Sequence, residues 1–85
     1  MLNYDIKITK TALKDIDLLT PKLKKKLKNI LIEVISDNPY LGKKLVGDLS
    51  PHYSYRLNIK DRILYLIDEK KKIVYMKRAK THYGN

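Results

Sequence analysis

The residues best suited to chemistry gather near the end of the chain, in the segment Arg78-Ala79-Lys80-Thr81-His82-Tyr83. The two other arginines of the sequence, Arg56 and Arg62, precede this segment in the same C-terminal third. Guanidinium groups bind phosphate through paired N–H donors, and a histidine with a pKa of about 6.5 donates a proton near neutral pH. Such a set suits metal-free RNA cleavage. In that reaction the 2′-hydroxyl attacks the neighbouring phosphate, cations stabilise the developing charge, and histidine protonates the leaving oxygen.

The spacing of these residues indicates that several share one face of a sheet. Alternate residues of an extended segment point the same way, so one face carries Arg56, Asn58 and Lys60. Another strand presents Arg78 and Lys80, and His82 follows if the chain stays extended. We therefore predict two sets of residues. The catalytic set is His82, Arg62, Arg56 and Arg78, and the RNA-binding set is Lys43, Lys44, Asn58, Lys60 and Lys80.

Each of these residues also has a purely structural interpretation. A single histidine near a chain end is often an idle surface residue, and Tyr83 can cap the edge of the core. Arg62 can form an ion pair with Asp61 or Asp68. Taken alone, the residues lead to a basic α+β domain that binds RNA or an acidic protein.

Composition sets the frame for these candidates. The 85 residues suffice for one domain with one small core, and we assign residues 1–85 to it. Lys and Arg number 19 against 9 Asp and Glu, a net charge of +10, which favours a polyanionic partner over a merely lysine-rich soluble protein. With no Cys, two His and no closely spaced carboxylates, we expect no metal and no cofactor. We find no signal peptide, and the longest apolar run, Ile63 to Ile67, is too short for a bilayer, so we expect a cytoplasmic protein without membrane contact.

The elements that must position the candidates follow from periodicity. Leu2 to Ile8 alternates apolar and polar residues, which predicts a half-buried strand. Thr9 or Thr11 can cap a first helix, and Thr20-Pro21 begins a second that ends by Asn38. The lysine cluster of residues 22–28 lies on the polar side of the second helix. It forms either a solvated helix face or a nucleic-acid patch.

The second half of the sequence predicts a sheet. An irregular segment runs from Pro39 to His52, and strands follow at residues 53–60, at residues 63–67 and from Ile73 through Arg78. The order β-α-α-β-β-β predicts an α+β domain. Its N-terminal helical hairpin packs on one face of a mostly antiparallel four-stranded sheet.

This pattern, with its sequence motifs, resembles the RelE/ParE superfamily of bacterial type II toxins over essentially the whole chain. The motifs are Lys44-Leu45-Val46-Gly47-Asp48-Leu49, Tyr55-Arg56-Leu57-Asn58-Ile59, Asp61-Arg62-Ile63-Leu64-Tyr65-Leu66-Ile67-Asp68 and Val74-Tyr75-Met76-Lys77-Arg78. The ending Thr81-His82-Tyr83 is similar to the YoeB and YafQ branches, in which a catalytic histidine stands beside an aromatic residue. ParE-like gyrase poisons lack that ending.

The resemblance implies a RelE-like fold and a ribosome-dependent mRNA endonuclease (an mRNA interferase) that inhibits translation. Its partners would be a cognate antitoxin, the ribosome and mRNA in the ribosomal A site. His82 matches the terminal catalytic histidine, Tyr83 the aromatic residue beside it, and Arg62 the arginine that opens the middle strand. Arg56 and Arg78 match basic residues of neighbouring strands.

The general base is the one departure from the family pattern. YoeB has a glutamate before the second strand that has no counterpart here, and only Asp48 and Asp61 are nearby. Asp61 is a candidate for the base and His52 a remoter one, although His52 can equally be structural. Two alternatives remain open: a ParE-like, non-catalytic inhibitor of DNA gyrase, and a basic RNA-binding module without catalysis.

Overall fold

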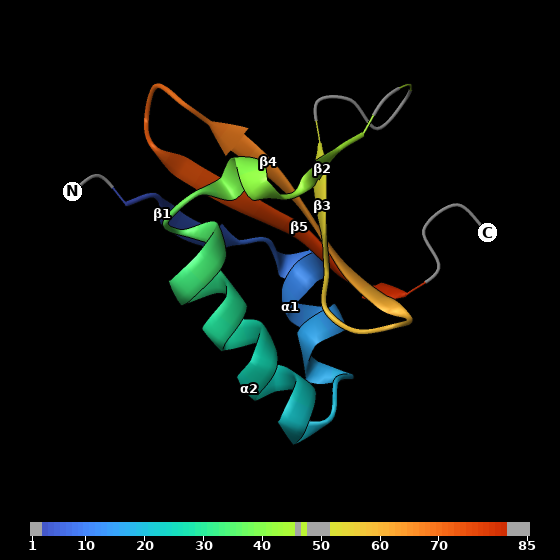
Figure 1. Ribbon diagram of the computed structural model, residues 1–85. Helices are drawn as coiled ribbons and strands as arrows, with labels where there is room; N and C mark the ends of the chain where they lie inside the picture. The colour runs from blue at the N-terminus through green and yellow to red at the C-terminus, as the bar shows by residue number, and fades with distance from the viewer. Residues whose placement is uncertain (1–2, 46, 48–51, 82–85) are drawn as a thin grey trace.

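A computed structural model describes residues 3–45, 47 and 52–81 of the chain (Figure 1). Along the chain its elements are β1 (Asp5–Ile8), α1 (Lys10–Asp17), α2 (Pro21–Ile30), η1 (Leu31–Ile35), η2 (Pro39–Leu41), β2 (Lys43–Lys44), β3 (Tyr53–Arg56), β4 (Asp61–Asp68) and β5 (Ile73–Thr81). The strands form one sheet in the order β1-β5-β4-β3-β2. Strand β1 runs parallel to β5, and the other neighbours are antiparallel.

The predicted architecture is confirmed, with one correction. Two helices pack on a mostly antiparallel sheet, as expected. The sheet has five strands and not four, because Lys43 and Lys44 pair with Ser54 and Tyr53 to form β2. A strand of two residues is too short to show the alternation on which the sequence prediction relied.

Threonine caps begin both helices. The Thr9 side chain accepts a hydrogen bond from the Ala12 amide at 3.2 Å, and the Thr20 side chain accepts one from the Leu23 amide at the same distance. Pro21 occupies the first turn of α2, where its missing N–H costs nothing. Each cap satisfies an amide that the first helical turn leaves without a partner.

The core lies between the helices and the inner face of the sheet. Its buried members are Ala12, Leu27, Leu31, Ile35, Leu57, Ile63, Tyr65, Val74, Met76 and Ala79. The Tyr65 hydroxyl donates a hydrogen bond to the Pro39 carbonyl at 2.6 Å, and burial raises the pKa of Tyr65 to about 12. This bond ties η2, and with it the start of β2, to the central strand.

No helix in the part of the chain that the structure describes is long and apolar enough to cross a membrane.

Candidate functional site

Two of the predicted cations, Arg56 and Arg62, lie opposite each other on the outer face of the sheet, which faces away from the helices, and the backbone of Lys80 continues this row on the next strand. Arg56 of β3 is the Cα partner of Arg62 of β4, and Arg62 is the partner of Lys80 of β5. Arg56 and Arg62 alternate with core residues, and both are exposed. Antiparallel partners have Cα atoms about 4.5–5.5 Å apart, and like charges placed directly opposite each other are destabilising. A positive row of this kind is therefore suited to holding an anion. We call it the cationic row.

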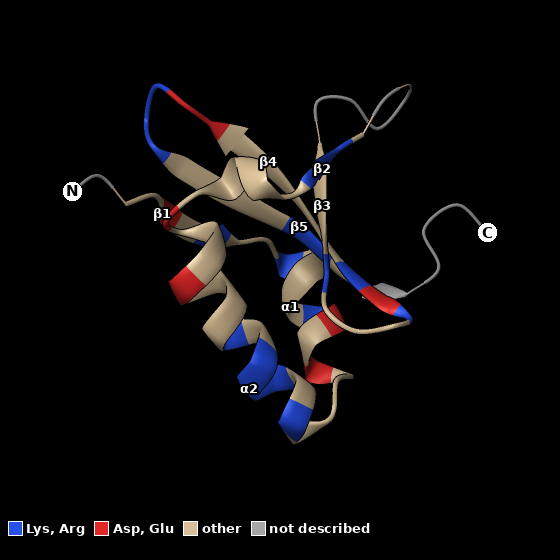
Figure 2. Cartoon of the chain, in the orientation of Figure 1, with Lys and Arg blue, Asp and Glu red and all other residues tan. Residues whose placement is uncertain are grey.

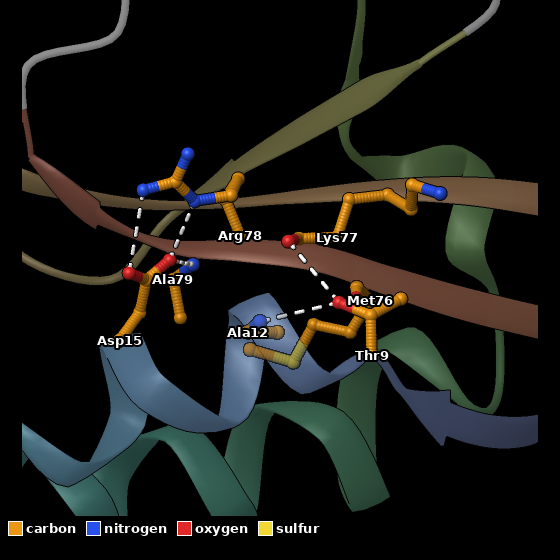
Figure 3. Close-up of polar contacts among 7 residues, drawn as sticks. All are labelled: Thr9, Ala12, Asp15, Met76, Lys77, Arg78 and Ala79. Atoms are coloured by element: carbon orange, nitrogen blue, oxygen red, sulfur yellow. Dashed lines mark hydrogen bonds and ion pairs between the residues drawn. The ribbon is translucent and has the colours of Figure 1, made fainter.

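A β-bulge places Arg78 on the same outer face. Met76 pairs with Tyr65 and Arg78 pairs with Leu64, so Lys77 has no partner of its own in β4. Without this extra residue, Arg78 would follow the parity of Met76 and point toward the helices. In Figure 3, Lys77 and Arg78 lie on one side of β5, and Met76 lies on the other, toward α1. The bulge brings Arg78 to the outer face, two residue pairs along from the Arg62–Lys80 pair of the cationic row.

The guanidinium of Arg78 is held by Asp15 of α1. Arg78 Nε donates to Asp15 Oδ2 at 2.8 Å and Arg78 Nη2 donates to Oδ1 at 3.4 Å (Figure 3). The Ala79 amide also donates to Asp15 Oδ2, at 3.0 Å. The Asp15 side chain is 7% exposed and that of Arg78 is 35% exposed. The carboxylate therefore binds both the side chain of Arg78 and the edge of β5, where β1 has already ended.

Sequence reasoning missed the role of Asp15. The sequence did contain a signal that could have revealed it: an acidic residue on the apolar side of α1, between Ala12 and Leu19. A buried carboxylate needs donors, and a basic strand supplies them.

The β3–β4 turn corrects the predicted strand. Strand β3 ends at Arg56, and residues 57–60 form a turn. The Asn58 side chain accepts hydrogen bonds from the Lys60 and Asp61 amides and donates one to the Asp61 carboxylate at 2.9 Å. Asparagine often forms such local bonds, which compete with strand pairing. Asn58 is thus a half-buried turn residue, and exposed Lys60 does not lie on a strand face with Arg56.

The two candidates for a general base lie away from the cationic row. Asp61 has the parity of Ile63, toward the helices, and shares a pocket with Asp15, Leu19 and other residues of the helical hairpin. His52 precedes β3, and at about 3.3 Å per residue it stands about 13 Å along the strand from Arg56. The structure brings neither to the row, and Asp48 lies outside the described residues.

The remaining predicted residues divide into two groups. Lys43 and Lys44 are exposed on β2, and Lys43 is the partner of Ser54 on β3. His82 and Tyr83 lie outside the described residues. Strand β5 is described through Thr81, the Cα partner of Asp61, so the described chain ends one residue beyond the partner of Arg62. Within the described ranges, no three His, Asp or Glu residues gather as a metal site would require.

Figure 2 shows how the charges are distributed. Lys and Arg follow α2 and recur where β3, β4 and β5 approach one another. Only a few acidic residues are interspersed. One of them is Asp15, which is already engaged with Arg78.

Comparisons with known proteins agree with the fold. Residues 6–84 match the model of a family described as the ParE-like toxin of type II bacterial toxin–antitoxin systems. A chain of the RelBE2 toxin–antitoxin complex from Mycobacterium tuberculosis is 28% identical, with a TM-score of 0.88 over 96% of this chain and 94% of that one. A chain of the YoeB–YefM complex from Staphylococcus aureus is 27% identical, with a TM-score of 0.76 over 94% and 98%.

A more distant structure shares the fold alone. It comes from the intact RelBE toxin–antitoxin complex of E. coli and is 21% identical, with a TM-score of 0.78 over 94% of this chain and 98% of that one. None of the curated protein sequences matches this chain.

Proposed function

Because the chain belongs to the ParE-like toxins of type II bacterial toxin–antitoxin systems, within the RelE/ParE superfamily, we propose that it is a ribosome-dependent mRNA endonuclease. The observation that carries the proposal is the cationic row, in which Arg56 and Arg62 face each other on exposed strand positions. Two forked guanidinium groups side by side match the oxygens of a phosphodiester in the act of cleavage. The structural neighbours of the RelE and YoeB type favour the same reaction class.

In the proposed reaction the 2′-hydroxyl of mRNA in the ribosomal A site attacks the adjacent phosphorus, and the P–O5′ bond breaks. Arg62 and Arg56 stabilise the negative charge that develops on the phosphate oxygens. His82 gives its proton to the departing 5′-oxygen, and Tyr83, the next residue in the chain, is proposed to support the same site. The products are a 2′,3′-cyclic phosphate end and a 5′-hydroxyl end. Charge stabilisation and protonation of the leaving group both fall to protein side chains, so the cleavage is proposed to be metal-independent.

Arg78 has a supporting part in this proposal. Its Nε and one Nη are engaged by Asp15, so its guanidinium is held against α1 at the edge of β5, two strands away from Arg56. A fixed charge loses less entropy on binding phosphate than a mobile one does. The proton of the 2′-hydroxyl is proposed to pass to water, because neither Asp61 nor His52, the two candidates for a general base, stands at the row.

We also propose a cognate antitoxin as the protein partner. The structures of the RelBE2 and YoeB–YefM type are complexes of a toxin with its antitoxin. An acidic antitoxin segment would complement the net charge of +10 and screen the arginines of the outer face.

The decisive experiment uses His82→Ala. The substitution is expected to leave a folded protein that still binds its antitoxin and whose mRNA cleavage on ribosomes falls about 10²–10⁴-fold, the usual contribution of general acid catalysis. Cleavage is measured by mapping mRNA ends, including the 2′,3′-cyclic phosphate. His52→Ala serves as the comparison, because His52 is the other histidine of the sequence. A comparable loss of cleavage in His52→Ala would indicate that a catalytic acid or base lies near His52, at the other end of β3. Parental rates from His82→Ala would refute the catalytic assignment.

A second function has one observation in its favour. The matching family model is named for ParE-like toxins, and a ParE-like, non-catalytic inhibitor of DNA gyrase is the alternative that the sequence motifs leave open. Supercoiling by purified gyrase, measured beside translation in a cell-free extract, separates the two functions. Inhibition of gyrase with intact mRNA would favour the second.

A further inference from the structure

A groove of about 760 Å³ runs from the cationic row along the outer edge of β3 to helix α2. It is lined by residues from α2, the η2–β2 segment, β3, the β3–β4 turn and β4: Lys26, Ile30, Leu41, Gly42, Lys43, Ser54, Tyr55, Arg56, Leu57, Asn58, Ile59 and Arg62. We call it the edge groove.

The edge groove exists because β2 is short. Strand β2 pairs only with Tyr53 and Ser54, so the outer edge of β3 has no described strand beside it from Tyr55 onward. Side chains from both faces of β3 therefore reach the groove: Arg56 from the outer face, and Tyr55 from the inner face. Across from them stand Lys26 and Ile30, which share one side of α2 because they are four residues apart.

The lining combines positive charge with apolar surface. Four of the twelve lining residues are Lys or Arg, and none of the twelve is Asp or Glu. Four others present apolar or aromatic surface, Ile30, Leu41, Tyr55 and Ile59, whereas Leu57 is fully buried beneath them. Ile59 is 91% exposed at the tip of the β3–β4 turn, so its side chain is accessible to a ligand in the groove. Single-stranded RNA offers the matching pair of features, phosphates for the cations and base faces for the apolar and aromatic side chains.

We propose that the edge groove binds the single-stranded nucleotides that flank the phosphate held at the cationic row, with Lys26 as their contact on α2. The inference deepens the proposed function and rests on it for the identity of the cleaved strand. RNA is favoured over an acidic peptide because the edge groove is continuous with the cationic row. Arg56 and Arg62 belong to both the row and the groove, so a strand bound at the row enters the groove without a break in cationic contacts. Tyr55 adds an aromatic face for a base.

The proposal selects one lysine from the cluster at residues 22–28. Lys26 lines the edge groove, whereas Lys25, its neighbour in the chain, does not. Both are exposed on the same helix and carry the same charge. Lys25→Ala is therefore a matched control for Lys26→Ala.

The test measures binding of an RNA that cannot be cut. A 2′-O-methyl oligoribonucleotide lacks the nucleophile, so its affinity for the full-length protein reports the groove without the chemistry. Lys26→Ala is expected to weaken binding and to lower the slope of log affinity against log salt by about 0.7, the loss of one phosphate contact to a single strand. Lys25→Ala is expected to keep the parental slope.

The aromatic contact is tested with the same RNA. Tyr55→Leu is expected to lower the affinity about 5- to 100-fold without changing the slope, and Tyr55→Phe is expected to keep the parental affinity. Thermal unfolding confirms that each variant is folded.

Each result decides between specific statements. Equal affinities and slopes for Lys26→Ala and Lys25→Ala would overturn the groove proposal. So would a glutamate-rich peptide whose binding depends on Lys26 while RNA binding does not, since the groove would then be a peptide site. A third result separates the two proposals. If RNA binding depends on Lys26 but the parental protein does not cleave mRNA on ribosomes, the groove proposal is supported and the proposed function is refuted.

Discussion

At the scale of single residues, Arg62 is the side chain on which the proposed chemistry depends most. It stands in the middle of the cationic row, with Arg56 as its partner on one side and Lys80 on the other. A transition state with charge spread over two oxygens is bound better by a forked guanidinium than by a point charge.

We therefore expect Arg62→Lys to reduce mRNA cleavage about 10²–10³-fold, the usual cost of losing one transition-state donor. Lysine keeps the positive charge at this exposed position, so the unfolding temperature is expected to stay close to that of the parent. Single-turnover cleavage on ribosomes and thermal unfolding of the same preparation check the two statements. A parallel loss of stability and activity would identify Arg62 as part of a structural ion pair.

Some of the site residues could be predicted from the sequence, and others could not. The face of Arg56 was predicted because alternation along a strand fixes the face that each side chain takes, whereas Arg62 was predicted from its place at the start of the middle strand. The ion pair of Arg78 was not foreseen. Neither its partner Asp15, 63 positions away in the chain, nor the bulge at Lys77 leaves a local pattern in the sequence.

At the scale of elements, the contact between α1 and β5 compensates for the early end of β1. Strand β1 stops at Ile8, the partner of Met76, and the Thr9 hydroxyl donates to the Met76 carbonyl at 3.0 Å. Beyond that point Asp15 accepts the Ala79 amide that a longer β1 would have taken. A helix side chain thus protects an edge that would otherwise leave a buried donor unpaired.

Asp15→Asn tests this arrangement. The amide oxygen can still accept from Ala79, but the charge that holds Arg78 is gone, so the free energy of unfolding is expected to fall by about 1–3 kcal/mol. Chemical denaturation gives the value. Asp17→Asn is the matched control, because Asp17 is exposed on the same helix. Combining Asp15→Asn with Arg78→Ala should give less than the sum of the single losses if the two side chains act as a pair. Equal stability of the Asp15→Asn and Asp17→Asn proteins would contradict the account.

Element boundaries show why part of the fold escaped sequence reading. The helices were predicted because Thr9 and Thr20 are local caps. The end of β3 was placed too late because Leu57 and Ile59 continue the apolar alternation. In the structure Leu57 is buried, whereas Ile59 is exposed, since the hydrogen bonds of Asn58 end the strand and reverse the chain. Local hydrogen bonding overrode the hydrophobic period.

At the scale of the whole molecule, three distant segments meet at Glu69, at the end of the sheet away from the cationic row. Its Oε1 accepts hydrogen bonds from the Tyr4 hydroxyl at 2.6 Å and the Tyr40 hydroxyl at 2.7 Å, and its Oε2 accepts one from the Lys72 ammonium. The same Lys72 Nζ stands 5.1 Å from the centre of the Tyr4 ring. The N-terminal segment, η2 and the β4–β5 turn are thereby joined through one carboxylate.

These bonds make the stability of the molecule depend on pH in the acidic range. The hydrogen bond from Lys72, followed by those from Tyr4 and Tyr40, lowers the pKa of Glu69 from 4.5 to about 2. A carboxylate whose pKa is lowered by folding stabilises the folded state above its unfolded pKa, and the stabilisation disappears as pH falls toward the folded pKa. The window for this group is therefore pH 4.5 down to about 2.

Comparison of the parent with Glu69→Gln isolates this contribution from the other carboxylates. At pH 6 the parent is expected to unfold at a higher temperature than the variant. The gap should narrow steadily below pH 4.5 and close near pH 2, because the protonated carboxyl of Glu69 is then uncharged, like the amide that replaces it in the variant. Glu33→Gln, exposed on η1, controls for the loss of one negative charge from a molecule of net charge +10. A gap between the parent and Glu69→Gln that stayed constant from pH 6 to pH 2 would show that the bonds of Glu69 do not depend on its charge.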